Sequence, residues 1–374
     1  MEQNVIQIRE SYQEILDVFA QNQIKRVFLV CDHAFQYLAI SHWLDEIEAS
    51  SKLSVTRFDH FQPNPDYESV VEGVRVFRES DSQAIWAVGG GSAMDVAKCI
   101  KLYAFLDPHE NYLQQTVVPN DIPLMAMPTT AGTGSESTRY AVVYKDGVKQ
   151  SIAHESCIPS VVILDPGALK TLPAYQRKST MLDALCHAVE SFWSVHATAE
   201  SKAYSRDALK MIRRYAEDYL ANCDEGNAGM LLAANTAGKA INLTQTTAGH
   251  AMCYKLTSLY GLAHGHAAAL CVNAIWPWML EHMDRCIDPR GESYLQETMQ
   301  QLAEAVGCST PKEAVKWFQN FLKELNMPAP KASLEDVETL CRSVNPTRLA
   351  NHPVALDTEA ITLLYRHILS ISEE

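Results

Sequence analysis

Short apolar runs alternate with amphipathic stretches in the first part of this chain, and the alternation ends near residues 165–166. Runs that suit buried strands occupy residues 26–31, 53–58, 84–88, 124–127 and 161–164. Helical periodicity fills residues 34–47 and 67–78. Continuous apolar strands joined by helices form parallel sheets that are covered on both faces. We therefore predict an α/β domain built on a parallel sheet.

From about residue 179 onward, apolar residues recur almost continuously with helical spacing, and strand patterns are few. This change of character predicts a domain boundary near residue 168. A chain of 374 residues is long enough for two domains. We expect an α/β domain over residues 1–168 and an all-α domain over residues 169–374.

Charge and cysteine content exclude several kinds of partner. The formal net charge of −14 at pH 7 repels nucleic acid and anionic membrane surfaces. No apolar run reaches the roughly 20 residues that span a bilayer, and the first residues lack the pattern of a secretory signal. The ten cysteines contain no C-x-x-C pair, which favours reduced thiols. These features predict a cytoplasmic protein that binds neither nucleic acid nor membrane.

Two loops rich in small residues follow predicted strands. The first is G-G-G-S-A-M-D-V-A-K at 89–98, where glycines let backbone approach a ligand and a helix start can hold a phosphate. It is not the G-x-G-x-x-G motif, and a tight turn without a ligand is the alternative. The second is P-T-T-A-G-T-G-S-E at 128–136, whose hydroxyls suit ribose or phosphate oxygens, although a surface loop would look the same. Two such loops at strand ends of one sheet predict a cofactor cleft.

Asp32 directly follows the apolar run at 26–31. A carboxylate at this place can accept hydrogen bonds from an adenosine ribose and repel a 2′-phosphate, which favours NAD(H) over NADP(H). An aspartate that caps the next helix is an equally physical interpretation.

One aspartate and three histidines predict a metal site. Asp183 and His187 are four residues apart in a helical stretch, so they share one helix face. His250 and His264 follow in G-H-A-M and A-H-G segments. One carboxylate and three imidazoles suit Fe(II), with Zn(II) as the alternative. Each histidine alone would more often be structural, so the prediction depends on the four as a set.

Several segments together resemble the iron-containing (group III) alcohol dehydrogenase family along nearly the whole chain. They are G-G-G-S-x-x-D-x-A-K at 89–98, T-T-A-G-T-G-S-E at 129–136, D-A-L-x-H-A-x-E at 183–190 and G-H-A-M…A-H-G at 249–265. Pairs ending in proline at 64–65, 165–166 and 345–346 also fall at family-like places. The resemblance implies a dehydroquinate synthase-like fold, in which a Rossmann-like dinucleotide-binding domain and a helical metal-binding domain enclose a cleft.

The resemblance also implies a role for individual residues. The metal ligands would be Asp183, His187, His250 and His264, and the pyrophosphate loop would contain Gly90, Gly91 and Ser92. The other cofactor-contacting positions correspond to Asp32, Asn64, Asp95, Thr129, Thr130, Thr133, Val142 and Lys149. The implied enzyme is an NAD(P)-dependent alcohol dehydrogenase that works as an aldehyde reductase. Its cofactors would be NAD(H), with NADP(H) as the alternative, and Fe²⁺ or Zn²⁺, and a homodimer is expected.

One position departs from the family pattern. Many relatives have a histidine four residues after the third metal ligand, where it can relay a proton, and this chain has Tyr254 there. The tyrosine hydroxyl, a water molecule or His266 would then supply the proton.

The segment at 254–266 resembles the phosphonoacetaldehyde reductase branch of the family. Common relatives have proline where Lys255 stands, and an ammonium there can pair with a phosphonate dianion; Arg139 and Arg348 are further candidates. A solvated or salt-bridged Lys255 is the alternative. We expect reduction of phosphonoacetaldehyde to 2-hydroxyethylphosphonate. A dehydrogenase of a small neutral alcohol or diol, a non-redox dehydroquinate synthase-like lyase and an inactive metal-binding protein remain as alternatives.

Overall fold

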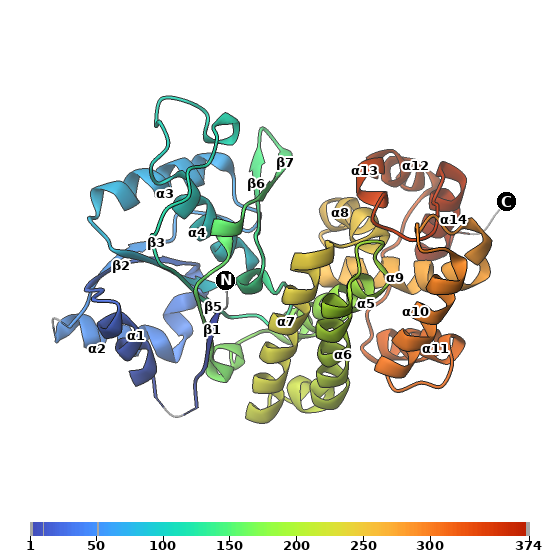
Figure 1. The fold of residues 1–374 in the computed structure, drawn as a ribbon, viewed down its shortest axis with the longest axis horizontal. Helices are drawn as coiled ribbons and strands as arrows, with labels where there is room; N and C mark the ends of the chain where they lie inside the picture. Colours follow the sequence, from blue (N-terminus) through green and yellow to red (C-terminus); the bar gives the residue numbers. More distant parts are fainter. Residues whose placement is uncertain (1–2, 10, 51, 372–374) are drawn as a thin grey trace. The chain divides into compact units, whose positions relative to one another are not determined.

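A computed structural model of the chain describes residues 3–9, 11–50 and 52–371 (Figure 1). It divides into two compact units. One comprises Met1–Leu172 with Ala221–Leu231, and the other comprises Pro173–Leu220 with Leu232–Glu374. We call them the α/β unit and the helical unit. Among the described residues, we find no helix that combines the length and the apolar composition of a membrane span.

The α/β unit contains a six-stranded sheet with the order β1-β8-β5-β4-β2-β3, and every neighbouring pair is parallel. The strands are β1 (Asn4–Gln7), β2 (Arg26–Cys31), β3 (Ser54–Phe58), β4 (Ala84–Gly89), β5 (Leu124–Pro128) and β8 (Val161–Leu164). The strands β4, β5 and β8 are buried along their whole length, as their continuous apolar runs predict. The predicted parallel α/β sheet is confirmed.

Helices cover both faces of this sheet (Figure 1). They are α1 (Gln13–Gln21), α2 (Ala39–Ala49), α3 (Tyr67–Glu79) and α4 (Gly91–Tyr103). Because side chains alternate along a strand, Phe28 and Val30 join the apolar core with α3 and α4, while Val27 and Leu29 join the core with α1 and α2.

Short 3₁₀ helices occur in both units. They occupy His33–Tyr37, Tyr112–Gln114, Ser135–Ser137, Glu155–Cys157, Pro166–Leu169 and, in the helical unit, Met283–Arg285.

Three features of the α/β unit differ from the sequence-based expectation. The strand β1 precedes the first predicted strand and lies at the sheet edge. An antiparallel hairpin, β6 (Tyr140–Lys145) and β7 (Val148–Ala153), follows the second small-residue loop. The helix expected over 34–47 is interrupted, because Leu38 adopts an extended conformation between the 3₁₀ helix His33–Tyr37 and α2.

The helical unit contains no strand within its described residues, in agreement with the predicted all-α C-terminal part. Its helices are α5 (Ala174–Trp193), α6 (Ala199–Leu220), α8 (Ala248–Tyr260), α9 (His264–Glu281), α10 (Glu292–Ala305), α11 (Pro311–Glu324), α12 (Leu334–Ser343), α13 (Pro346–Leu349) and α14 (Thr358–Ile368). Helix α7 (Asp224–Thr244) contributes to both units. Helix α5 is buried along most of its length and packs against α6 and α9, so residues of α5 lie at the centre of the unit.

Candidate functional site

Helix α5 carries the first part of the predicted metal motif on one face. Asp183, His187 and Glu190 follow one another at spacings of four and three residues, so their side chains project from the same side of the helix. All three residues are buried.

Two further histidines reach this region from the starts of other helices. His250 is the third residue of α8, and His264 is the first residue of α9. Each is next to a glycine on which a side chain would clash. A Cβ on Gly249 would lie 3.0 Å from the carboxylate of Glu190, and one on Gly265 would lie 2.0 Å from a backbone oxygen of α5. The glycines therefore allow the close helix contacts that bring both imidazoles to α5.

The four predicted metal residues converge. Oδ1 of Asp183 lies 3.4 Å from Nε2 of His250, 3.9 Å from Nε2 of His187 and 4.0 Å from Nε2 of His264. One ligand atom from each of Asp183, His187 and His250 lies within 4.8 Å of the others. These three side chains are at most 7% exposed, whereas His264 is 39% exposed. His264 therefore forms the accessible side of the cluster.

The chemistry of the cluster fits a divalent cation. Oδ1 of Asp183 and Nε2 of His250 are buried, and neither makes a hydrogen bond to the described parts of the chain. Leaving buried polar atoms unpaired is costly, and an ion between them would remove that cost. Burial opposes the charge on Asp183, but the neighbouring imidazoles hold the pKa of its carboxyl well below the usual range. A carboxylate with imidazoles suits Fe(II) or Zn(II).

Behind His250 lies a buried carboxylate, Glu190, which the sequence pattern alone did not single out. It is hydrogen-bonded to Nδ1 of His250, and its other oxygen accepts hydrogen bonds from the hydroxyl (2.6 Å) and backbone N–H (3.0 Å) of Thr247. Burial opposes ionisation, but His250 and these hydrogen bonds lower the pKa of Glu190 to about 2. A carboxylate behind a ligand histidine fixes its tautomer and orientation. The sequence offered one clue to Glu190: it lies two helical turns after Asp183 and so shares its helix face.

Tyr254 lies one turn of α8 after His250 and contacts the accessible side of the cluster. Its ring stacks on His264 with centroids 5.7 Å apart and planes 19° apart. Nη1 of Arg348 donates a hydrogen bond to the Tyr254 hydroxyl at 3.1 Å, and the guanidinium carbon lies 5.1 Å from the ring centre. The structure thus brings two of the predicted catalytic or substrate residues to a predicted metal ligand.

His266 faces away from the cluster. It is two residues after His264 on α9, which places the two side chains about 200° apart around the helix axis. Nδ1 of His266 lies 3.0 Å from the hydroxyl of Tyr175, and its backbone N–H donates to Ser179. These contacts anchor the start of α9 to α5.

Lys255 and Arg139 have different surroundings. Lys255 is half-buried on α8, about 140° around the axis from His250. Arg139 belongs to the α/β unit, where Nη1 pairs with Glu155 at 2.6 Å. Among the described residues of the helical unit, no hydrogen bond or ion pair joins Lys255 to the four predicted metal residues.

In the α/β unit, the predicted pyrophosphate loop follows β4 where the sheet order reverses. The strands β3 and β4 lie on opposite sides of β2 and next to it, so the chain crosses back at this point. Ligands of open α/β sheets bind beside such a crossing, at the carboxyl ends of the strands. Asp32 lies at this crossing, next to the end of β4, because a Cβ built on Gly89 would be 3.2 Å from its Oδ2. Its Oδ1 accepts a hydrogen bond from the backbone N–H of Ala34 at 2.9 Å, so Asp32 also caps the short helix that follows.

The two small-residue loops touch each other. A Cβ on Gly90 would lie 3.7 Å from the methyl of Thr130, and one on Gly91 would lie 3.2 Å from the methyl of Thr133. The second pair is tight for any side chain larger than hydrogen. Four of the predicted cofactor residues are therefore neighbours.

Backbone hydrogen bonds join further predicted residues to the same place. The N–H of Thr129 donates to the carbonyl of Gly89 at 3.1 Å. Asn64 has a left-handed φ of 58°, and its N–H donates to the hydroxyl of Ser92 at 3.2 Å. Asparagine tolerates this backbone conformation better than most residues.

The hairpin β6–β7 brings Val142 and Lys149 to Asp95. Burial raises the pKa of Asp95 to about 7, against the charges of Lys98 and Lys149 and a hydrogen bond from the backbone of Val142. These contacts connect helix α4 with the hairpin beside the predicted pyrophosphate loop.

Lys98 is a structural residue of this region that the sequence interpretation missed. The residue is only 1% exposed. Its ammonium donates hydrogen bonds to the carbonyl (2.6 Å) and hydroxyl (2.9 Å) of Ser135, the hydroxyl of Thr138 (3.2 Å) and the carbonyl of Tyr140 (2.7 Å). It therefore ties the helix after the first loop to the end of the second loop. Its place at the end of G-G-G-S-x-x-D-x-A-K was the sequence feature that could have identified Lys98.

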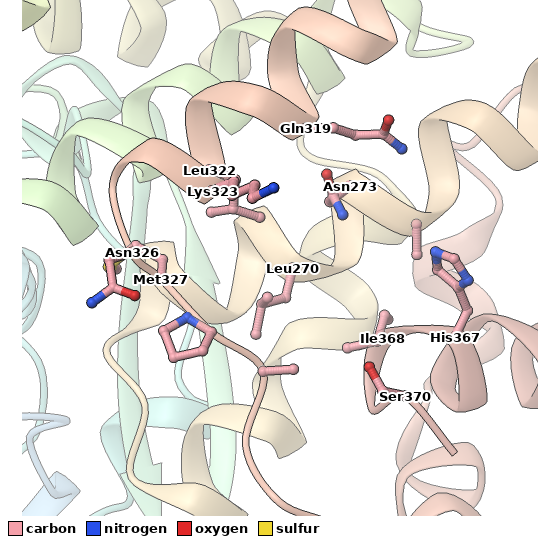
Figure 2. A pocket seen from close by; sticks show the side chains of 13 residues that line it. Leu270, Asn273, Gln319, Leu322, Lys323, Asn326, Met327, His367, Ile368 and Ser370 are labelled. Carbon is pink, nitrogen blue, oxygen red and sulfur yellow. The ribbon is translucent and has the colours of Figure 1, made fainter. Parts of the chain in front are cut away.

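A separate cavity of about 410 Å³ lies in the helical unit, and Figure 2 shows the side chains that line it. Asn273, Lys323 and His367 line it, together with apolar side chains such as Leu270 and Leu322. None of the four metal residues lines this cavity. Its size alone does not make it the reaction site.

Comparison with known proteins gives matches along nearly the whole chain. Residues 3–166 match the family described as iron-containing alcohol dehydrogenase, and residues 178–369 match the C-terminal part of that family. Alcohol dehydrogenase 4 of Saccharomyces cerevisiae is 29% identical over 367 residues, covering 91% of this chain and 92% of that protein. Phosphonoacetaldehyde reductase of Streptomyces viridochromogenes is 29% identical over 311 residues, covering 79% of this chain and 78% of that protein.

Solved structures have the same fold. Sulfoacetaldehyde reductase from Bifidobacterium kashiwanohense, crystallised in complex with NAD⁺, superposes with a TM-score of 0.87 at 25% identity. The superposition covers 99% of this chain and 98% of that one.

Proposed function

This chain belongs to the iron-containing alcohol dehydrogenase family, and from that premise we propose that it reduces phosphonoacetaldehyde to 2-hydroxyethylphosphonate with NADH. Family membership confirms the predicted oxidoreductase, with iron and a nicotinamide dinucleotide as its cofactors. Five further statements about this enzyme are proposals. They concern the individual site residues, the substrate, the choice of NADH over NADPH, the homodimer and the cytoplasmic location.

The position of Arg348 is the observation that favours an anionic aldehyde. Its guanidinium donates to Tyr254, whose ring stacks on His264 at the accessible side of the metal cluster. A guanidinium presents its donors in a planar fork that matches the oxygens of a phosphonate. An aldehyde next to the metal would then have its anionic group within reach of Arg348. A small neutral alcohol has no use for this charge.

Asp183, His187, His250 and His264 would hold the iron, which supplies a Lewis acid for the aldehyde oxygen. The small-residue loops, with Gly90 and Gly91 against Thr130 and Thr133, leave room for the backbone to hold a pyrophosphate.

The proposed proton donor is Tyr254. Because its hydroxyl accepts a hydrogen bond from Arg348, its own O–H can point toward the substrate oxygen. With hydride supplied by bound NADH, Oη of Tyr254 would donate the proton that completes the alcohol, and solvent would return a proton to the tyrosine. His266 is less suited to this step, since it faces Tyr175 on the other side of α9.

Steady-state rates with phosphonoacetaldehyde, sulfoacetaldehyde and propionaldehyde test the proposal. The Fe(II)-loaded enzyme would be assayed with NADH and with NADPH at saturating metal. We expect kcat/KM for phosphonoacetaldehyde to be highest. In Arg348→Ala it should fall roughly 100-fold, from the loss of charged hydrogen bonds, while propionaldehyde loses less than about 5-fold.

Two variants act as controls. Arg348→Lys keeps the charge without the planar fork and should recover only part of the rate. Arg342→Ala removes an exposed arginine of α12 that pairs with Glu338 at 3.1 Å, and it should change nothing. Equal kcat/KM for all three aldehydes would leave a dehydrogenase of neutral alcohols, and a preference for sulfoacetaldehyde would replace the phosphonate by a sulfonate.

A further inference from the structure

We propose that Tyr254 is a positioning residue that fixes His264 for metal binding, and that Arg348 holds Tyr254 in place. The inference rests on the proposed metal role of His264. It assigns the tyrosine ring a function that is separate from any proton transfer by its hydroxyl.

His264 needs more support than the other metal residues. Its side chain is 39% exposed, whereas those of Asp183, His187 and His250 are 4%, 7% and 2% exposed. It is also the first residue of α9, so no earlier turn of its own helix packs beside it. An exposed imidazole at a helix start has more rotameric freedom, and fixing it for metal binding costs entropy.

The supports differ between two of the histidines. His250 is held by the buried carboxylate of Glu190 at Nδ1. At Nδ1 of His264 we find the thiol of Cys253 at 3.7 Å, and a thiol is a weak hydrogen-bonding group. Two rings pack against the imidazole: that of His250 lies edge-on at 5.3 Å between centroids, and that of Tyr254 is nearly parallel to it, at 5.7 Å and 19°. Stacking restricts rotation of the imidazole, so Nε2 stays directed toward Asp183.

Arg348 fixes the tyrosine in turn. It lies on the four-residue helix α13, whose first turn is capped by Asn345. The hydrogen bond to the Tyr254 hydroxyl (3.1 Å) and the position of the guanidinium near the ring (5.1 Å) restrain both ends of the phenol. Loss of Arg348 should therefore loosen His264 indirectly, and less than loss of the ring does.

The dissociation constant of Zn²⁺, measured by competition with a chelator, tests this arrangement. Removing a residue that orients a metal ligand typically weakens binding about 10- to 100-fold, and we expect about 10-fold for Tyr254→Leu. Tyr254→Phe keeps the ring and should stay within about 3-fold of the parent, although its kcat falls if the hydroxyl donates the proton. Arg348→Met should lie between the two. Tyr260→Leu, the same change farther along α8, is the matched control and should have no effect.

A spectroscopic measurement separates positioning from general destabilisation. The visible absorption of bound Co²⁺ reports ligand geometry, so it should change in Tyr254→Leu and not in Tyr254→Phe or Tyr260→Leu. Parent-like Zn²⁺ affinity and an unchanged Co²⁺ spectrum in Tyr254→Leu would overturn the proposal, even if reductase activity is lost. If Tyr254→Leu does not fold, unchanged affinity in Arg348→Met overturns the role of the arginine. Failure of the parent protein to bind any metal would instead refute the proposed function itself.

Discussion

The carboxylate of Glu190 is hydrogen-bonded to Nδ1 of His250, and neither side chain is more than 2% exposed. This bond leaves Nε2 of His250, 3.4 Å from Oδ1 of Asp183, as the nitrogen that faces the predicted metal cluster. Glu190, which is not one of the four predicted metal residues, therefore sets the tautomer of this histidine.

Replacing Glu190 by glutamine should weaken Zn²⁺ binding about 10- to 100-fold, as expected for loss of a carboxylate behind a ligand histidine. The change keeps the shape of the side chain and removes its charge. Competition with a chelator would measure the effect. Glu136→Gln alters a buried glutamate of the α/β unit and should leave metal affinity unchanged. Parent-like affinity in Glu190→Gln would mean that packing alone orients His250.

Gly265→Ala should damage the metal cluster by moving a helix. The new methyl would lie 2.0 Å from the backbone oxygen of Ser179, which cannot rotate away as a side chain can. Helix α9 must then move away from α5 and carry His264 with it. We expect a loss of at least about 10-fold in Zn²⁺ affinity and a stability loss of about 1–3 kcal/mol or more, measured by chelator competition and thermal unfolding.

Gly261→Ala is the control for that prediction. Gly261 has a left-handed φ of 66° and no atom within 4 Å of a built Cβ, so alanine costs roughly 1–2 kcal/mol of backbone strain. Metal affinity should stay the same. Similar metal affinities in the two alanine variants would contradict a steric role for Gly265.

Sequence periodicity predicted what depends on local spacing. The continuous apolar runs predicted β4 and β5 closely, and the spacing of Asp183 and His187 placed both on one helix face. The edge strand β1 was missed because it has only two consecutive partly buried residues. The hairpin β6–β7 had a usable signal, since Asp146 and Gly147 have positive φ as expected for a tight Asp-Gly turn.

Tertiary contacts were outside the reach of sequence patterns. The pair Tyr254 and Arg348 is separated by 94 positions, and no local pattern specifies which residues meet across that distance. The same holds for His352, an ordinary histidine in the sequence that is fully buried in the structure. The place of Lys255 in its sequence segment likewise does not specify the direction of its side chain on α8, and its pairing with a phosphonate stays a prediction.

Lys98→Met should weaken NADH binding without affecting the metal cluster. It removes the donor for four acceptors that connect helix α4 to the segment at 135–140. Hydrogen bonds from a charged group contribute about 1.5–3 kcal/mol each, so the two loops should lose their fixed arrangement. Fluorescence titration should give a dissociation constant for NADH at least about 10-fold higher, with parent-like Zn²⁺ affinity. Lys101→Met, on the same helix, should retain NADH affinity.

His352 should make the protein less stable in mild acid. Neither ring nitrogen has a hydrogen-bond partner among the described residues, and burial lowers the pKa of His352 to about 4 despite the charge of Glu190. An unfolded histidine takes up its proton near pH 6.5, so the stabilising contribution is complete above that pH and is lost as the pH falls toward 4. Between pH 7 and pH 5 the free energy of unfolding should fall by about 2 kcal/mol through this residue.

Urea unfolding of the parent and of His352→Phe at both pH values measures this contribution. Phenylalanine keeps an aromatic ring against Trp193, whose centroid is 6.3 Å from that of His352. The parent should lose about 2 kcal/mol more than the variant on acidification. His109→Phe, at an exposed position, should behave like the parent. Equal losses in the parent and His352→Phe would show that His352 is protonated at the same pH in both states.

Asp32 has two functions that substitution can separate. Its Oδ2 is placed beside the turn at Gly89, where its charge would repel the 2′-phosphate of NADPH, and its Oδ1 caps the helix that begins at His33. Asp32→Asn keeps a good cap and removes the charge, whereas Asp32→Ala removes both. The ratio of kcat/KM for NADPH to that for NADH should rise at least about 10-fold in both variants. Only the alanine variant should lose about 1 kcal/mol of stability. An unchanged cofactor ratio in Asp32→Asn, with destabilisation in Asp32→Ala, would reduce Asp32 to a helix cap.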